Sequence, residues 1–341
     1  MQNESWKIDS GIINKWSSKF HGWYHYPEHL ISTQLADGME FKSVDCPLVF
    51  QIEGDNKWYM FYTGFEGVGY QTMLVSSKDL ICWENKGLVM SYGGAGVYDF
   101  GGVSFGGLLF QSYNLKDKRI LKRVNGMYQA LYGCYPKQGG YEIRPGAEGR
   151  AISKDGLKWE RISNERPILS VDGANEWEKD CIYQPWLLEH DGKYYNFYNA
   201  ANGIYEQIGV AFSEDLLNWE RYKINPILEN GEKGSYDEYF CSDGKVFYDE
   251  DHWVMFYFGV KIEQEVWSAH IMAAFSYDLL HWTKDSEPLY KAGDHPEGLD
   301  KNFAHKISIV FNPVNDVLYM YYNAVGIRGR GIGLITSKKI I

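Results

Sequence analysis

The sequence has too little positive charge and no apolar run long enough for several broad classes of protein. Its 34 lysine and arginine residues face 45 aspartates and glutamates, for a formal net charge of −11. Nucleic acids and anionic membranes are bound through basic surfaces, so we expect neither as a partner. No stretch approaches the ~20 apolar residues that span a bilayer. The N-terminus also lacks the basic and apolar regions of a signal peptide. We therefore expect a cytoplasmic protein, with a signal peptide already removed as the open alternative.

Cysteine is scarce and odd in number. The five cysteines lack the Cys-x-x-Cys and Cys/His spacings that are typical of metal sites. We interpret them as reduced and mostly structural, as in intracellular proteins. The sequence therefore predicts no metal site built on cysteine, and no motif in it requires a cofactor.

Aromatic residues, in contrast, make up 16% of the chain and follow a repeated pattern. An aromatic strand, a turn and a second strand lead into Ser-x-Asp-Leu-x-x-Trp or a remnant of it. The aromatic strands are Trp58–Tyr62, Tyr128–Tyr132, Tyr194–Tyr198, Trp253–Tyr257 and Leu318–Tyr322. A spacing of roughly 60 to 75 residues is too long for a solenoid repeat and suits one four-stranded blade of a β-propeller.

The predicted fold is therefore all-β: a five-bladed β-propeller with four-stranded antiparallel blades around a central channel. Residues 1–341 would form one domain, with residues 1 to about 40 as a lead-in outside the repeats. The last repeat stops before its fourth strand. We predict that a strand of the lead-in pairs with the last blade, because closing the ring removes a free sheet edge.

The Ser-x-Asp-Leu-x-x-Trp motif could be mistaken for an active site. It recurs from blade to blade, for example at Ser213–Trp219, and a role repeated in this way is structural. Its serine or aspartate can satisfy backbone groups of a turn, while its leucine and tryptophan pack between blades.

Acidic residues outside this motif gather near the predicted starts of the innermost strands. Asp45 heads the first of these strands, and His305 takes the same place in the fifth. The remaining acidic candidates are Asp99, Asp180, Asp237, Glu238 and Asp243. Strand heads converge on one pocket in a propeller, and several carboxyl groups in a confined pocket can hydrolyse glycosides. One must stay ionised while another is held protonated by burial or a like charge. Asp99, Asp180 and Asp237 could instead cap turns, whereas Asp45 has no obvious turn to cap.

The repeats resemble the five-bladed propeller glycosidases of families 43, 32 and 130. The resemblance rests on the blade motif Ala211–Trp219 and the strand Tyr194–Tyr198, and it covers nearly the whole chain. It implies an aspartate at the head of the first innermost strand as base or nucleophile. Asp45 in Asp45-Cys46-Pro47 matches that position, with one residue inserted before the proline. A second family aspartate, which precedes a proline on a later blade, is replaced here by Gln184.

The resemblance also implies a glutamate of the third or fourth blade as general acid. Glu238 is the nearest candidate, and His305 is its rival. The carboxylate that tunes this acid would be Asp180, Asp99 or Asp243. Substrate contacts are expected at Asp99, Tyr183, Gln184 and Trp186. So many oxygen atoms are also consistent with a structural or channel cation such as Ca²⁺, although no ligand motif requires one.

Two further groups of residues bear on the substrate. The candidate aromatic surface for a sugar consists of Trp23, Tyr98, Tyr183, Trp186 and Trp267. Anion ligands, which phosphate or an acidic sugar would need, are expected among Arg144, Arg150, Arg328 and Arg330.

The leading prediction is a glycosidase that removes a terminal sugar from a plant or algal oligosaccharide. Asp45 would act as base with inversion of configuration, as the resemblance to family 43 implies. Resemblance to family 130 leaves a glycoside phosphorylase open. The missing aspartate before Pro185 leaves open a non-catalytic carbohydrate-binding propeller. The sequence does not define the sugar, the linkage or the oligomeric state.

Overall fold

The computed structural model describes residues 6–20, 22–34, 40–162 and 166–340. The described chain is almost entirely β-structure, which confirms the all-β prediction. None of the helices in these ranges is long and apolar enough to cross a membrane.

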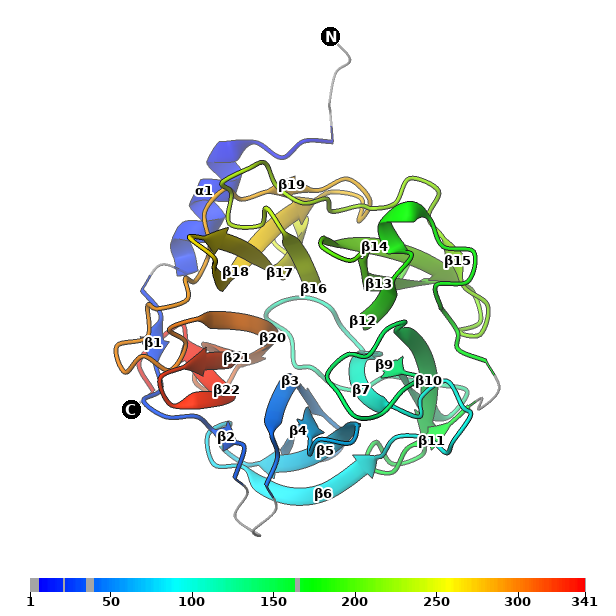
Figure 1. Ribbon diagram of the computed structural model, residues 1–341. Coiled ribbons are helices and arrows are strands. Elements are labelled where there is room, and N and C mark those ends of the chain that lie inside the picture. Colours follow the sequence, from blue (N-terminus) through cyan, green and yellow to red (C-terminus); the bar gives the residue numbers. More distant parts are fainter. Residues whose placement is uncertain (1–5, 21, 35–39, 163–165, 341) are drawn as a thin grey trace.

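Strand pairing divides the described chain into five consecutive antiparallel units, which stand in a ring about a common axis (Figure 1). Unit 1 contains β3 (Ser43–Gln51), β4 (Trp58–Phe65), β5 (Tyr70–Ser77) and β6 (Glu84–Met90). Unit 2 contains β7 (Gly102–Leu108), β9 (Met127–Tyr135), β10 (Ala147–Ser153) and β11 (Glu160–Arg161), with β8 (Arg123–Val124) paired to β9. Unit 3 contains β12 (Cys181–His190), β13 (Lys193–Ala201), β14 (Glu206–Ser213) and β15 (Glu220–Arg221). Unit 4 contains β16 (Phe240–Asp249), β17 (His252–Glu263), β18 (Val266–Ser276) and β19 (Thr283–Lys284). Unit 5 contains β20 (Phe303–Asn312), β21 (Val317–Gly326) and β22 (Gly329–Thr336).

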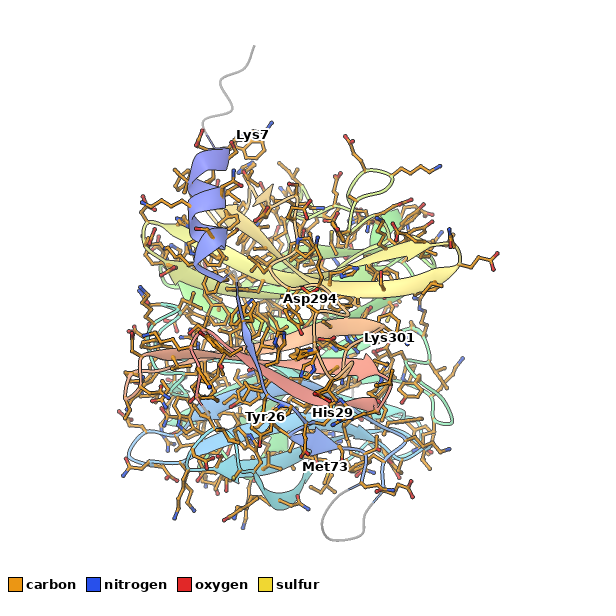
Figure 2. The ribbon with its side chains drawn as sticks, turned by 90° about the vertical axis from the view of Figure 1, so that its left-hand side faces the viewer. Lys7, Tyr26, His29, Met73, Asp294 and Lys301 are labelled. Carbon is orange, nitrogen blue, oxygen red and sulfur yellow. The ribbon has the colours of Figure 1, made fainter. Side chains whose placement is uncertain are left out.

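The N-terminal segment completes unit 5. It contains α1 (Ser10–Ser17), the 3₁₀ turn η1 (Ser18–Phe20), β1 (Tyr24–His25) and β2 (Ile31–Ser32). Both β1 and β2 pair antiparallel with β22, so the first and last strands of the described chain close the ring. Figure 2 shows this segment along the outside of the ring, from Lys7 past Tyr26 to His29.

Every innermost strand carries a β-bulge near its start. The pairing register shifts between Asp45 and Leu48, Phe105 and Gly107, Tyr183 and Trp186, Ser242 and Lys245, and His305 and Ile307. Four bulge residues have a positive φ: Cys46 at 50°, Gln184 at 54°, Asp243 at 57° and Lys306 at 50°. A bulge bends its strand and re-aims the neighbouring side chains. Because the five bulges share one register, they direct a ring of side chains to the same end of the axis.

A buried carboxylate also recurs, just before the innermost strands of units 2 to 5. The members are Asp99, Glu178 in the 3₁₀ turn η2 (Glu176–Glu178), Asp237 and Asp300. In units 3 to 5 this carboxylate accepts a hydrogen bond from a tyrosine hydroxyl of the second strand. In units 2 to 4 it pairs with a cation of a following strand, as Asp99 does with Arg161. Asp99, which we expected to bind substrate, is therefore a member of a repeated structural set.

A loop between β7 and β8 crosses the ring at the far ends of the innermost strands, opposite the bulges (Figure 1). The Leu115 amide donates to the Tyr248 carbonyl of unit 4, and the Leu121 amide donates to the Gln51 carbonyl of unit 1. Arg119, only 1% exposed, donates to the loop carbonyls of Ser112, Asn114, Leu115 and Asp117. Its guanidinium lies 4.5 Å from the centre of the Phe247 ring. The loop therefore closes one end of the ring.

Replacing Arg119 by methionine should lower the free energy of unfolding by about 2–4 kcal/mol, because it leaves several buried carbonyls without a donor. Urea denaturation would measure this loss, with Arg166→Met at an exposed position as the matched control. Equal midpoints for the two variants would show that Arg119 does not hold the loop.

Candidate active site

The bulged ends of the innermost strands and the starts of the third strands enclose a cavity of about 230 Å³. Its titratable lining residues are Asp45, Glu142, Glu206, His305, Lys306 and Arg330. Its aromatic lining residues are Tyr141, Tyr183, Phe240, Phe258, Trp267 and Phe303. A mostly apolar cavity with a few convergent polar groups is the usual form of a small-molecule site. A larger groove of about 600 Å³ includes Ser213, Asp215 and Trp219, which belong to the repeated structural motif. We therefore place the candidate site in the smaller cavity.

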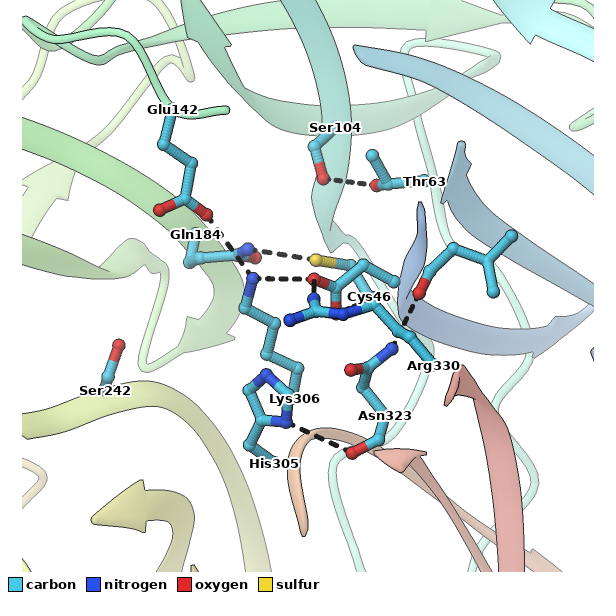
Figure 3. A network of polar contacts seen from close by, with 12 residues as sticks. Cys46, Thr63, Ser104, Glu142, Gln184, Ser242, His305, Lys306, Asn323 and Arg330 are labelled. Carbon is cyan, nitrogen blue, oxygen red and sulfur yellow. Dashed lines mark hydrogen bonds and ion pairs between the residues drawn. The ribbon is translucent and has the colours of Figure 1, made fainter. Parts of the chain in front are cut away.

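Asp45 is the centre of an ion cluster that joins unit 1 to unit 5. Its Oδ2 lies 3.0 Å from Lys306 Nζ and 2.9 Å from Arg330 Nη1 (Figure 3). Its Oδ1 accepts a hydrogen bond of 2.9 Å from the Cys46 amide. Burial raises the pKa of Asp45, but the two cations outweigh burial and hold the pKa well below its usual range. Asp45 therefore stays ionised and has little tendency to accept a proton.

Glu206, at the start of β14, is a cavity carboxyl group whose pKa is raised, in contrast to that of Asp45. It is 6% exposed and accepts a hydrogen bond of 2.9 Å from Ser242 Oγ, besides a hydrogen bond with Tyr183. Burial raises its pKa to about 7, and the negative charge of Glu142 adds to this rise. Glu206 can therefore hold a proton near neutral pH and release it to a bound ligand, as a general acid requires.

Glu142 stands on the loop between β9 and β10, at the rim of the cavity. Its Oε1 lies 3.4 Å from Lys306 Nζ. Figure 3 shows the two side chains joined by a dashed line. The side chain is 38% exposed, so water can reach it. Lys306 thus lies between two carboxylates, Asp45 inside and Glu142 at the rim.

His305 lines the cavity between two aromatic rings, 5.3 Å from Phe258 and 5.6 Å from Phe303. Its Nδ1 lies 3.1 Å from the Asn323 carbonyl oxygen, which can only accept, so Nδ1 carries the proton. Burial lowers the pKa of His305 to about 3. The ring is therefore neutral at physiological pH, with Nε2 as a hydrogen-bond acceptor. This state suits a ligand contact better than the general acid that we considered.

Of the nine site residues expected from the sequence, Asp45, Tyr183 and His305 line the cavity. Glu238 does not, because its carboxylate accepts the Gly234 amide within the loop before β16. Asp180 also lies outside the lining, 3.8 Å from Arg144. Asp243 forms a buried ion pair of 2.6 Å with Lys245 and donates its amide to Asn199.

Gln184 and Trp186, which we also expected to bind substrate, do not line the cavity and make structural contacts instead. Gln184 donates to Cys46 Sγ over 3.0 Å and so links units 3 and 1 (Figure 3). Trp186 is buried in the core and donates its indole N–H to the Val246 carbonyl. Among the aromatic candidates Trp267 does line the cavity, and so does Arg330 among the arginines.

Sequence reasoning missed Glu206, Glu142 and Lys306 as a set. The predicted site residues stand near the heads of the innermost strands, whereas Glu206 begins a third strand, at the position that Arg330 takes in unit 5. Glu142 had a usable signal, since the loop from β9 to β10 is long for a hairpin, and long loops are often functional. Within the described residues, no three His, Cys, Asp or Glu side chains gather as a metal site.

The ring of β-units thus has a propeller-like form and carries a cavity lined by carboxyl groups at the bulged ends of its innermost strands. The family model of glycoside hydrolase family 130, described as beta-1,4-mannooligosaccharide phosphorylase, matches residues 115–330, and the chain belongs to this family. The resemblance expected from the sequence is thereby confirmed.

One curated protein and two solved structures are similar to this chain. The 1,2-beta-oligomannan phosphorylase of Thermoanaerobacter sp. (strain X514) is 27% identical over 179 residues, which are 49% of this chain and 51% of that protein. The match thus spans about half the length of this curated relative. A solved glycoside hydrolase has a TM-score of 0.81 with 25% identity, covering 98% of this chain and 97% of the other. A solved complex of BT0996 and RGII has a TM-score of 0.80 with the same identity and coverage.

Replacing Asp45 by asparagine should destabilise the protein by about 3–5 kcal/mol at neutral pH, because it leaves buried cations without their partner. The pKa of Asp45 is lowered in the folded state, so this stabilisation is complete above the unfolded pKa of about 3.9 and is lost as the pH falls below it.

Thermal unfolding of both proteins from pH 7 to pH 3 would measure the difference, with Asp191→Asn in an exposed turn as control. A difference in melting temperature that stays constant down to pH 3 would contradict the assigned ion cluster.

Proposed function

We propose that this protein is a glycoside hydrolase that removes a terminal sugar from an oligosaccharide. One observation carries the proposal: the cavity buries Glu206, whose pKa of about 7 lets it hold a proton near neutral pH, while both cavity cations are already paired with Asp45. The first feature supplies an acid for the leaving oxygen. The second leaves little positive charge for a phosphate dianion.

In this mechanism Glu206 donates its proton to the glycosidic oxygen as the bond to the anomeric carbon breaks. Ser242 and Tyr183 orient the carboxyl group through hydrogen bonds. The negative charge of Glu142 favours the protonated form of Glu206 before the transfer. A second carboxyl group whose charge raises the pKa of the acid is the usual electrostatic arrangement in glycosidases.

Glu142 is the better candidate for the base. Its Oε1 lies 3.4 Å from Lys306 Nζ, its side chain is open to water, and it acts on Glu206 through its charge. Asp45, the base that we expected, would instead fix Lys306 and Arg330 beside the sugar, because its low pKa makes it a weak proton acceptor. A base that activates water inverts the anomeric configuration, so inversion remains our expectation.

The shape of the site supports action on chain ends. The volume of about 230 Å³ is below the range of roughly 300–1,000 Å³ that drug-sized ligands occupy, and so suits a single sugar ring. The loop held by Arg119 closes the far end of the ring, so a chain cannot pass through. We also infer that the five units are the blades of one five-bladed propeller spanning residues 1–341.

The substrate is proposed to be a plant or algal oligosaccharide. The similar solved complex of BT0996 and RGII supports an oligosaccharide ligand, because 98% of this chain aligns with it. The aromatic lining suits the apolar faces of sugar rings.

A phosphorylase is the second candidate. The description of the matching family and the name of the Thermoanaerobacter relative favour it. Lys306 and Arg330 would have to exchange part of their contact with Asp45 for a phosphate. A non-catalytic binding protein is the weaker alternative, because a bound ligand alone gives no reason for a buried acid.

Replacing Glu206 by glutamine should lower kcat by about 10²–10⁴-fold on substrates with a poor leaving group, the usual contribution of a general acid. Wild-type kcat should also fall as the pH rises above about 7, because Glu206 then loses its proton. Initial rates from pH 5 to pH 9 would test both, with Glu238→Gln as the control. Full activity of the Glu206 variant at pH 8 would exclude it as the acid.

Turnover of oligosaccharides should not depend on phosphate. We would incubate the protein with a panel of plant, algal and mannan oligosaccharides, with and without inorganic phosphate, and identify products by chromatography and NMR. Free sugar of inverted configuration in both conditions is expected. A sugar 1-phosphate, formed with strict dependence on phosphate, would replace hydrolysis by phosphorolysis.

A further inference from the structure

Three aromatic side chains form a ridge that leads away from the cavity over units 3 and 4. Trp267 lines the cavity itself. Its ring centre lies 6.0 Å from that of Tyr239, which in turn lies 6.0 Å from Tyr205, with an angle of 16° between the two tyrosine rings. Trp267 is 43% exposed and Tyr205 is 41% exposed. We call these three residues the aromatic ridge.

The backbone beneath the ridge is fixed by hydrogen bonds. The Tyr239 amide donates to the Val260 carbonyl, and the Tyr239 carbonyl accepts from the Glu206 amide and from Asn230 Nδ2. Tyr205 stands at the tip of the β13–β14 hairpin, where its amide donates to Asn202 Oδ1. Trp267 follows the tight turn at Gln264 and Glu265, both with positive φ, which suits a two-residue hairpin. The rings therefore stand on a preorganised backbone.

The fold does not need exposed apolar side chains at these hairpin tips. Ile204 and Val266, beside Tyr205 and Trp267, are also exposed, so the ridge lies within an apolar patch. A contiguous exposed apolar patch marks a site of interaction. In the hairpin that carries Trp267, Lys261 and Glu263 pair with each other, and the exposed Glu265 at the turn adds one negative charge.

We propose that the aromatic ridge binds the leaving-group portion of the oligosaccharide, as two or three consecutive neutral sugar rings stacked on Trp267, Tyr239 and Tyr205. The proposal rests on the proposed function, because it places the terminal sugar in the cavity beside Glu206. The main support is continuity: Trp267 is part of the cavity wall, and Tyr239 and Tyr205, which are not among its lining residues, follow it through successive ring contacts. We specify neutral sugar rings because a sugar stacks through its apolar C–H face, and the negative charge of Glu265 beside the ridge disfavours an acidic sugar.

The test compares a long substrate with a short one. For Tyr205→Ala, kcat/KM should fall about tenfold more on a neutral oligosaccharide of four to six residues than on an aryl glycoside of the same terminal sugar. Tyr205→Phe should restore the ratio, because the ring and not the hydroxyl makes the contact. Tyr277→Ala is the matched control, since Tyr277 is 46% exposed and lines a groove with residues at the other ends of the strands.

A measurement of binding affinity tests the ridge independently of catalysis. Calorimetry with Glu206→Gln protein, titrated with manno-, gluco-, galacto- and arabino-oligosaccharides, should show affinity that rises with chain length and falls about tenfold on adding Tyr205→Ala. Such binding, together with no turnover of the same oligosaccharides by the wild-type protein, would support the ridge and reject the hydrolase. Affinity that Tyr205→Ala leaves unchanged, or no binding by any of the four series, would overturn the ridge. A dimer in light scattering that Tyr205→Ala dissociates would instead assign the patch to a second copy of this protein.

Discussion

The pairing of β1 and β2 with β22 is the contact on which the rest of the structure depends, because it joins the two ends of the chain into a ring. The ring brings β3 of unit 1 against β20 of unit 5. Across this seam the Val49 amide donates to Ser308 Oγ, and Asn323 Nδ2 donates to the Val44 carbonyl. The Asp45 cluster lies at the same seam, with its carboxylate on one unit and its two cations on the other. The contacts that close the ring therefore also bring the residues of the Asp45 cluster together.

The environment of each carboxyl group decides its role. Asp45 and Glu206 are both buried, and burial alone would raise the pKa of each. Asp45 meets two cations and stays ionised. For Glu206, burial and the negative charge of Glu142 outweigh the hydrogen bonds from hydroxyl groups, which lower its pKa, so it can keep its proton. The difference in pKa gives the cavity one fixed charge, which holds the two cations, and one carboxyl group that can transfer a proton.

Repetition separates structural from functional carboxylates in this protein. Asp99 shares its place before the innermost strand with Glu178, Asp237 and Asp300, and it serves the same internal pairing in its unit. Glu206 and Asp45 have no such counterparts: the equivalent third-strand residue of unit 5 is Arg330, and the bulge residues that match Asp45 are of other types. The residues that differ from the repeat are the ones that lie together in the cavity.

The strands, the repeat and the family could be predicted from the chain, because aromatic strands and turn motifs are local patterns. Asp45, Tyr183 and His305 were predicted as site residues, and these three line the cavity. The groups that lie beside these residues follow only from the folded structure. Glu206, Glu142 and Lys306 lie on three different units, and their protonation depends on burial and on charges that are distant in the chain. Glu238 and Asp180 looked equivalent in sequence but lie in loops outside the cavity. A local pattern along the chain predicts where a strand lies. The charge around a side chain depends on the residues that closure of the ring places beside it, and these are distant in the sequence.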